Sequence, residues 1–277
     1  MLNHGLFALY RWTILAGAVA APTLSLLGCQ LAARDRAMQT LCITQGALVG
    51  VLVGMAVTPS FGETDLEHSI LPPLIALIFS LLTHAATERL VHGKESSRNT
   101  HFALIFCFLV SCGYLVTALL PQLENHMTHV YFGDLATLST EGAEVAVAVS
   151  LITLIVLVQG RRRFTYDSFN EAVFGTSRPF WKDPFHWYAL TLVSFSVQHL
   201  GFLYTTSMLF VPTAILSLSR SGGLSFHLLS CALLAAVSST LGMLVSLSFP
   251  RLPTVPSIVI VMCFLGSVGL LVVRRTA

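Results

Sequence analysis

The chain has 277 residues, of which 55% are hydrophobic and only 10% are charged, and its mean hydropathy is +0.78. Soluble globular proteins carry about 25% charged residues, so 13 acidic and 15 basic side chains cannot cover a water-facing surface of this size. The composition argues against a soluble enzyme, a disordered tail and a nucleic-acid-binding protein, and the net charge of +2 is too small to indicate an anionic partner. An all-α, multi-pass helical bundle in a lipid bilayer remains.

Apolar stretches long enough to cross a bilayer follow one another along the chain. A membrane helix needs about 20 mostly apolar residues, and we expect single spans at residues 12–33, 41–57, 70–87, 101–120, 143–158, 226–247 and 258–273. Residues 187–218 are more than one crossing needs, and Gly201 and Pro212 permit a break there. This stretch forms either one tilted helix or two short ones, so the sequence predicts eight or nine spans in a single domain over residues 1–277.

Lysine and arginine divide unevenly between the two sets of loops. Only Arg11 and Arg251 lie on one side, whereas 13 basic residues, including Arg161, Arg162 and Arg163, lie on the other. Short cytoplasmic loops are enriched in these residues, so the N-terminus is predicted to lie outside and the C-terminus in the cytoplasm. Ends on opposite sides require an odd number of crossings, which favours nine.

Few strongly polar side chains lie within the spans. Such groups are costly in a bilayer and are therefore candidates for a transport pathway: Gln45, Gln198, His199, and Glu144 with Glu141 at the outer end of span 143–158. The alternatives are an interhelical hydrogen bond for His199 and, for Gln45, close helix packing beside neighbouring glycines.

Signatures of catalysis are missing from the sequence. It contains neither HExxH nor GxSxG, so the chain is not expected to be an enzyme. His84 and Glu88 are four residues apart, a spacing that can hold a metal, but a capping or snorkelling role near the helix end is favoured. The six cysteines lie in apolar stretches and are expected to be buried small hydrophobic residues.

The longest cytoplasmic segment is predicted to contain a short helix. Asp167 or Ser168 can cap its start, Glu171 lies in its first turns, and Gly175 can end it. An exposed amphipathic helix is suited to docking a partner. The alternative is a helix lying in the lipid interface and anchored by arginine and phenylalanine.

Several short motifs occur in a characteristic order from about residue 34 to the C-terminus. They are Gly50 with Gly54, Phe132-Gly133-Asp134-Leu135, Tyr166-Asp167 followed by Gly175, Gly201 followed by Ser207 and Pro212, and Pro253 followed by Pro256 and Ser257. In this order and spacing, the chain resembles the membrane permeases of ATP-binding-cassette (ABC) importers for zinc, manganese and iron.

The resemblance implies an assembly and a function. It implies a permease homodimer in a bacterial inner membrane, two cytoplasmic ATPases that bind Mg-ATP, and an extracytoplasmic solute-binding protein, while this chain itself binds no cofactor. The cargo would be zinc first, then manganese or iron, with no metal ligands assigned. The segment 164–178 would contain the helix that couples to the ATPase, with the residues Tyr166, Asp167, Phe169, Glu171 and Gly175.

The chain departs from the family pattern at one important place. The second span of the family carries Gly-Asp-x-x-x-His, and the matching positions here are Thr40, Leu41 and Gln45. Leucine cannot coordinate a metal, and a neutral amide is a poor zinc ligand. Either other groups carry the ion, or the substrate is a chelated metal or another small solute. An ATP-independent secondary transporter is a further alternative, although no mid-span Asp or Glu supports ion coupling.

Overall fold

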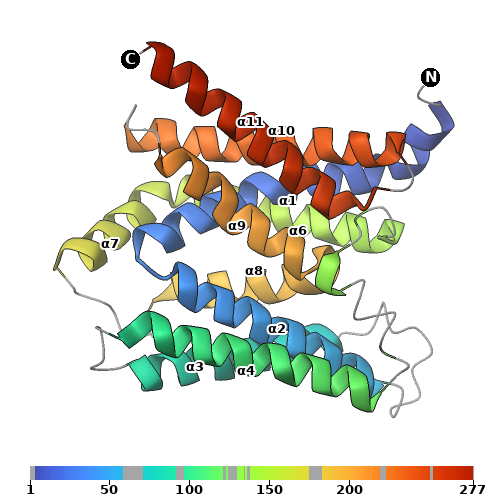
Figure 1. Cartoon of the computed structure of the whole chain (residues 1–277), viewed down its shortest axis with the longest axis vertical. Helices are drawn as coiled ribbons and strands as arrows, with labels where there is room; N and C mark the ends of the chain where they lie inside the picture. The colour runs from blue at the N-terminus through green and yellow to red at the C-terminus, as the bar shows by residue number, and fades with distance from the viewer. Residues whose placement is uncertain are drawn as a thin grey trace. The chain divides into compact units, whose positions relative to one another are not determined.

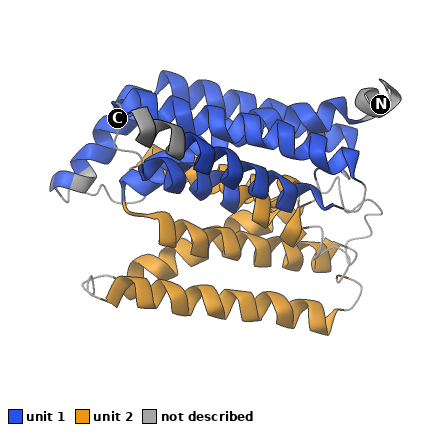
Figure 2. Cartoon of the chain, turned by 45° about the horizontal axis from the view of Figure 1, so that its top comes forward, with its two compact units in different colours: residues 1–34, 134–177, 206–277 blue, residues 35–133, 178–205 orange. Residues whose placement is uncertain are grey.

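The computed structural model describes residues 4–58, 71–91, 97–120, 123, 130–133, 135, 138–174, 183–218, 223–249 and 252–276. The chain forms two compact units, coloured separately in Figure 2. Unit 1 comprises Met1–Arg34, Asp134–Ser177 and Thr206–Ala277, and unit 2 comprises Asp35–Gly133 and Arg178–Thr205. Each unit thus collects segments that are distant in sequence. The single domain expected over residues 1–277 stays a prediction.

Helices account for nearly all of the described residues (Figure 1). Unit 1 contains α1 (His4–Ala33), α6 (Thr140–Gln159), α7 (Arg161–Phe174), α10 (Leu224–Ser248) and α11 (Thr254–Thr276). Unit 2 contains α2 (Ala37–Val57), α3 (Leu71–Val91), α4 (Arg98–Leu119) and α8 (Pro184–Leu200). The first residues of α9 (Phe202–Ser217) belong to unit 2 and the rest to unit 1.

The predicted spans correspond to helices of the structure. Six described helices are long and apolar enough to cross a membrane, namely Tyr10–Ala33 within α1, together with α2, α3, α4, α6 and α10. The predicted stretch 187–218 is divided between α8 and α9, and the break falls at Gly201. The all-helical, multi-pass fold is therefore confirmed, while the number of crossings and the sides on which the two ends lie stay predictions.

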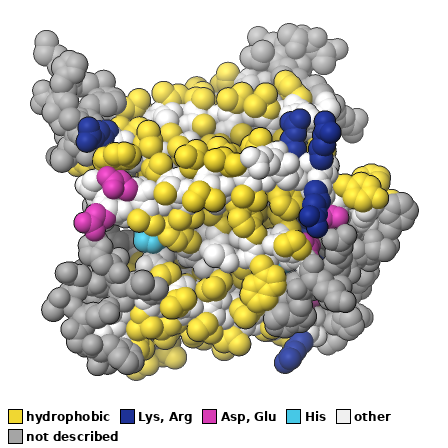
Figure 3. Space-filling view, turned by 180° about the vertical axis from the view of Figure 1, so that it is seen from behind, with side chains coloured by type: hydrophobic (Ala, Val, Ile, Leu, Met, Phe, Trp, Pro, Cys, Tyr) yellow, Lys and Arg dark blue, Asp and Glu magenta, His cyan; other side chains and the backbone are white. Residues whose placement is uncertain are grey.

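The surface of the described helices is the kind that lipid covers. Large apolar side chains are exposed along α3, α4, α6, α10 and α11, and yellow hydrophobic side chains fill much of the face in Figure 3. Only 28% to 33% of the apolar windows of α3, α4, α6 and α10 is buried, against 67% for α1 and 72% for α2. Acyl chains can cover such faces without the loss of free energy that water would impose. The larger buried shares make α1 the central helix of unit 1 and α2 that of unit 2.

Unit 1 is organised around α1, which packs against α6, α7 and α10. Gly28 allows α1 to lie directly on the backbone of α9, because a Cβ atom there would be only 1.8 Å from the carbonyl oxygen of Leu209. In the same unit, Gly242 of α10 touches the backbone of Ile258 in α11. Small residues at such positions let membrane helices approach closely enough for dense van der Waals packing.

Unit 2 is organised around α2, which packs against α3, α4 and α8. Gly46, Gly50 and Gly54 form a line along α2 that faces α3. A Cβ atom on Gly50 would lie 2.6 Å from the Cα of Ala76, and one on Gly54 would lie 2.6 Å from the Cα of Pro72. The close packing that the sequence offered as an alternative for this face is present between α2 and α3.

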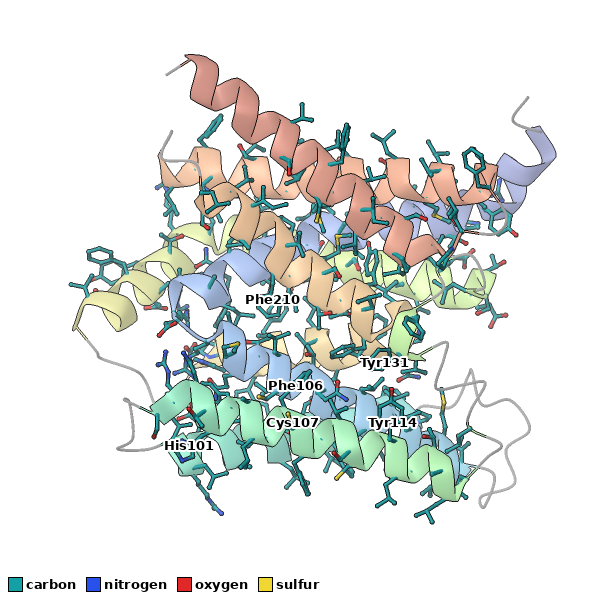
Figure 4. All side chains as sticks on the ribbon, viewed as in Figure 1. His101, Phe106, Cys107, Tyr114, Tyr131 and Phe210 are labelled. Carbon is teal, nitrogen blue, oxygen red and sulfur yellow. The ribbon has the colours of Figure 1, made fainter. Side chains whose placement is uncertain are left out.

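The helix α4 covers another face of α2. Its buried residues Phe102, Ile105 and Leu109 pack with Cys42 and Val49, and Phe106 lies at the edge of the same cluster. Figure 4 labels His101, Phe106, Cys107 and Tyr114 along this helix. The repeat of three and four residues leaves the opposite side of α4 apolar and exposed, as expected for a helix at the edge of a bundle in lipid.

Candidate functional site

The predicted docking helix exists, but its start was predicted wrongly. The helix α7 begins at Arg161 and ends at Phe174, so Asp167 and Ser168 lie inside the helix and cap nothing at its N-terminus. Glu171 also lies within α7, and Gly175 lies outside the described residues. The capping prediction failed because the helix already starts at Arg161, where the Phe164 N–H donates to the Gly160 carbonyl (3.0 Å), so Ser168 lies in its interior.

A buried polar network joins α7 to the end of α1. The Arg34 Nε–H donates to Ser168 Oγ (3.0 Å), and the Ser168 hydroxyl shares its proton between Gln30 Oε1 (2.9 Å) and the carbonyl of Phe164 in its own helix (2.8 Å). Gln30 Nε2 also reaches the hydroxyl of Thr165 (3.4 Å). Arg34, Gln30 and Ser168 are all buried. Because a buried guanidinium and a buried amide are expensive to leave unpaired, this network fixes the orientation of α7 on α1.

The opposite side of α7 is exposed and apolar. Tyr166, Phe169 and Val173 are 65%, 58% and 56% exposed, and their spacing of three and four residues places them on one face, here called the outer face of α7. Asp167 is half-buried between this face and the anchored one. A helix held on one side and apolar on the other is suited to docking a partner.

A pocket adjoins the outer face. It has a volume of about 530 Å³, lies between α7 and the start of α10, and is lined by Arg161, Arg162, Thr165, Tyr166, Phe169, Leu224, Ser225 and Leu228. Tyr166 and Phe169 thus belong both to the outer face and to the wall of the pocket. The combination of two guanidinium groups with aromatic rings favours a partner that offers apolar side chains and acidic groups together.

Two motif glycines meet within unit 2. Gly133 (φ +69°) and Gly201 (φ +88°) both have positive φ, and a Cβ atom on Gly201 would lie 2.3 Å from the Cα of Gly133. Nearby, Tyr131 and Phe202 stack with ring centroids 5.3 Å apart; Tyr131 is labelled in Figure 4. The contact therefore places the break between α8 and α9 directly against the segment 130–133. Of the other residues in this motif, Phe132 is exposed and Asp134 lies outside the described residues.

We expect Gly201→Ala to destabilise the chain by at least about 2 kcal/mol, because it adds an unfavourable backbone conformation to a steric clash with Gly133. Thermal unfolding of the purified chain in detergent measures the change. The matched control is Gly269→Ala, since a Cβ atom at this exposed helical position meets nothing within 4 Å. Equal unfolding temperatures for the two variants would contradict this account.

The predicted pathway residues differ in their surroundings. Gln45 of α2 is fully buried, and its Oε1 atom accepts no hydrogen bond from the described residues; the same holds for the Oε1 atom of Gln198 in α8. His199 is half-buried, with its ring 4.4 Å from that of Phe195. Glu144 is exposed on α6 in unit 1. Although α2 and α8 pack together, no hydrogen bond joins Gln45 to Gln198 or His199 in the described part of the chain.

The two motif prolines and Leu41 lie within helices. Pro212 is buried within α9, and Pro256 lies half-buried in the first turn of α11. Proline removes a backbone donor inside a helix and is tolerated at a helix start, so the two have different local effects. Leu41, at the position of the missing acidic residue, is half-buried in α2.

Unit 2 contains a polar cluster that the sequence prediction did not assemble. Gln39 Nε2 donates to Glu88 (3.0 Å) and Thr87 (3.1 Å) and lies 3.3 Å from His84 Nδ1. The ring of His84 is 6.2 Å from that of His186, whose Nδ1 is 2.9 Å from Asp183. This explains the spacing of His84 and Glu88 as part of a hydrogen-bonded helix junction.

Asp183 was detectable in the sequence as a start signal for α8. It precedes Pro184, the preferred first residue of a helix, and its carboxylate accepts from the backbone N–H of Phe185 (3.0 Å). Its second role as the partner of His186 follows from the spacing of three residues on the same turn. The contribution of Gln39, which comes from a distant segment, had no local signal.

The features described so far define a multi-pass membrane permease. Its apolar helices have lipid-facing surfaces and pack closely through glycines, the stretch from α8 to α9 is interrupted at Gly201, and α7 is anchored on one side with an exposed apolar face on the other. Comparison with protein families agrees. The model of the ABC 3 transport family matches residues 7–272, and the chain belongs to this family of ABC metal-ion permeases. The resemblance drawn from the motifs is thereby confirmed.

The fold is also similar to a solved structure. It matches PsaBC from Streptococcus pneumoniae in complex with Fab, with a TM-score of 0.74 over 93% of this chain and 89% of that chain. The sequences are 18% identical over this match, so the likeness concerns the fold. A search of curated proteins finds no match.

Proposed function

We propose that this chain is the permease of a bacterial ABC importer that moves a transition-metal ion, zinc first and manganese or iron next, across the inner membrane. Two copies of the chain form the pathway, two cytoplasmic ATPases hydrolyse Mg-ATP, and an extracytoplasmic solute-binding protein delivers the ion. The observation that carries this proposal is α7, which is anchored to α1 on one side and presents the apolar residues Tyr166, Phe169 and Val173 on the other.

In this proposal, α7 transmits movement of the ATPase into the membrane. The outer face of α7 inserts into the ATPase, and the link through Ser168, Gln30 and Arg34 pulls on the end of α1. Since α1 is the central helix of unit 1, a shift at its end reaches the helices packed around it. A rigid coupling of this kind needs the buried hydrogen bonds to persist while the ATPase moves.

The orientation in the bilayer follows the distribution of positive charge. Arg34, the three arginines at the start of α7 and Arg98 lie at or beside helix ends that the positive-inside rule assigns to the cytoplasm. The α7 segment then faces the ATPases. Glu144, near the start of α6, lies on the outer side, where an acidic group attracts arriving cations.

The pathway in this proposal contains the amide oxygens of Gln45 and Gln198. Both are buried and have no donor in the described part of the chain, so they can accept a bond from a passing group. His199 follows Gln198 on α8 and supplies an imidazole, a good ligand for zinc. We assign these three residues to the pathway and assign none to a permanent metal site.

The direct test is the metal content of cells that contain or lack this chain, with the partner ATPase intact, grown in metal-poor medium. We expect a selective loss of one transition metal, zinc first, when the chain is missing. A catalytically inactive ATPase provides the control and should produce the same loss. Uptake that persists with the inactive ATPase would instead support a secondary transporter, and no change in any metal would overturn the proposal of a free-ion importer.

A second candidate, import of a chelated metal, is favoured by one observation. Leu41 and Gln45 occupy the places where the family carries an acid and an imidazole, and the buried Oε1 atom of Gln45 accepts no hydrogen bond from the described residues. A neutral site binds a bare divalent cation poorly, whereas a chelate carries its own ligands and needs only shape and hydrogen bonds.

The double change Leu41→Asp with Gln45→His tests whether a bare ion passes these positions. If the bare ion passes these positions, we expect the restored pair to change the metal concentration for half-maximal uptake severalfold and to alter selectivity, because two strong ligands are added. The matched control, Leu41→Asn with Gln45→Asn, places a neutral amide at each position and adds neither an acid nor an imidazole. Unchanged uptake in both variants would place Leu41 and Gln45 outside the pathway.

A further inference from the structure

Three metal-ligating side chains meet in unit 1, whereas the predicted pathway residues of α2 and α8 belong to unit 2. They are Cys29 of α1 and His227 and Cys231 of α10, and their ligand atoms all lie within 4.8 Å of one another. Cys231 is fully buried and Cys29 is 7% exposed. Within the part of the chain that the structure describes, no other group of three such residues comes this close.

The fold brings these residues together for identifiable reasons. His227 and Cys231 are four residues apart, so they lie on one face of α10 in adjacent turns. The helices α1 and α10 pack against each other, which brings Cys29 to the same face. Its neighbour Gly28 holds α1 against the backbone of α9, because any larger side chain would strike Leu209.

The distances suit a tetrahedral metal ion. Zinc bonds of about 2.3 Å to sulfur and about 2.05 Å to nitrogen place two such ligands roughly 3.6 Å apart and two sulfurs roughly 3.8 Å apart. The Sγ of Cys231 is 3.6 Å from Nε2 of His227. Because every pair of ligand atoms lies within 4.8 Å, the Sγ of Cys29 needs to move only a short way toward the other two ligands to reach these distances.

A supporting contact orients the third ligand. The hydroxyl of Thr213 in α9 lies 3.2 Å from the Sγ of Cys29. A hydroxyl that donates to a metal-bound thiolate stabilises its charge and fixes its direction, as residues around metal ligands commonly do. The set of two sulfurs, an imidazole and one such partner selects a thiophilic ion and disfavours magnesium or calcium, which prefer oxygen ligands.

We propose that Cys29, His227 and Cys231 bind a thiophilic divalent metal ion of the zinc type, with a water molecule or an anion as fourth ligand. Binding releases the two thiol protons, and the Thr213 hydroxyl donates to the Cys29 thiolate. The site joins α1 to α10 one residue before Gln30, the residue that holds Ser168 of α7. The site can be tested on the isolated chain, so the outcome of that test does not depend on the proposed transport function.

Cobalt(II) titration of the full-length chain, purified in detergent with a phosphine reductant, tests this site. Cobalt bound by cysteine thiolates gives a sulfur-to-metal charge-transfer absorption that oxygen ligands do not give. We expect this absorption to saturate at one ion per chain and to disappear when zinc is added. Cys29→Ser and Cys231→Ser should each remove most of it, and His227→Ala should weaken binding at least tenfold.

The matched control is Cys42→Ser. Cys42 is equally buried but lies in unit 2, where its thiol donates to the carbonyl of Phe102 (3.2 Å); this variant should bind cobalt like the wild type. Native mass spectrometry of the wild type with zinc provides a measurement that needs no variant to fold. Absence of the sulfur band in the wild type, its persistence after both Cys29→Ser and Cys231→Ser, or a Cys29–Cys231 disulfide that survives the phosphine would overturn the proposal.

Discussion

Phe169→Glu is expected to abolish binding of the ATPase and to reduce metal uptake to background. Phe169 is 58% exposed at the centre of the outer face of α7 and also lines the adjoining pocket. An aromatic anchor at the centre of an interface is commonly worth 2 kcal/mol or more, and an unpaired buried carboxylate adds a further penalty. We therefore expect the affinity for the ATPase to fall at least about 30-fold.

Copurification of the tagged ATPase from detergent extracts, with metal uptake measured in the same cells, checks this expectation. Phe169→Leu is the matched control, because it keeps an apolar side chain at the same position and should retain most of the binding. Since the side chain faces away from α1, neither variant should lower the unfolding temperature greatly. Normal copurification and uptake with Phe169→Glu would show that α7 is not the coupling element.

Arg34→Met is expected to separate ATP hydrolysis from transport. The guanidinium of Arg34 is buried and donates to Ser168, so the change leaves a buried polar network without one of its donors. Each polar group left unpaired costs about 1–3 kcal/mol. Because the outer face of α7 is untouched, we expect the ATPase to bind and to hydrolyse ATP while uptake falls at least about tenfold.

Reconstitution of the complex in proteoliposomes, with ATP hydrolysis and metal uptake measured side by side, tests this separation. Arg34→Lys keeps the charge but lacks the planar guanidinium, and should recover only part of the coupling. Arg98→Met is the control for loss of a cation elsewhere, because Arg98 pairs with Asp35 in unit 2. Proportional loss of hydrolysis and uptake in Arg34→Met would mean that the network only stabilises the fold.

Patterns within a single helix were predicted well from the sequence. Three features depend on residues whose effect is local to their own helix: the apolar spans, the close packing at Gly50 and Gly54, and the break at Gly201. Their signals are hydropathy, the absence of a side chain, and the freedom of glycine to adopt positive φ. The same local reasoning identified Tyr166 and Phe169 as part of a helix, although it placed the start of that helix too late.

Features that join distant segments could not be predicted in this way. Ser168 looked like a helix cap because serine commonly has that role, whereas in the structure its hydroxyl meets Arg34 of another helix. Cys29 and Cys231 likewise looked like ordinary buried thiols, because that is the common role of cysteine in an apolar stretch. Only the packing of α1 on α10 shows that His227 lies beside both.

The exposed outer face of α7 also makes overproduction of this chain relative to its partner harmful. In the proposed assembly, a chain whose Tyr166, Phe169 and Val173 are not yet covered by an ATPase presents an apolar surface of the kind that promotes aggregation. Molecules produced in excess of their partner would therefore be substrates for membrane quality-control proteases. Matched synthesis of the two subunits, for instance from one messenger RNA, is the arrangement that would keep such orphan molecules scarce.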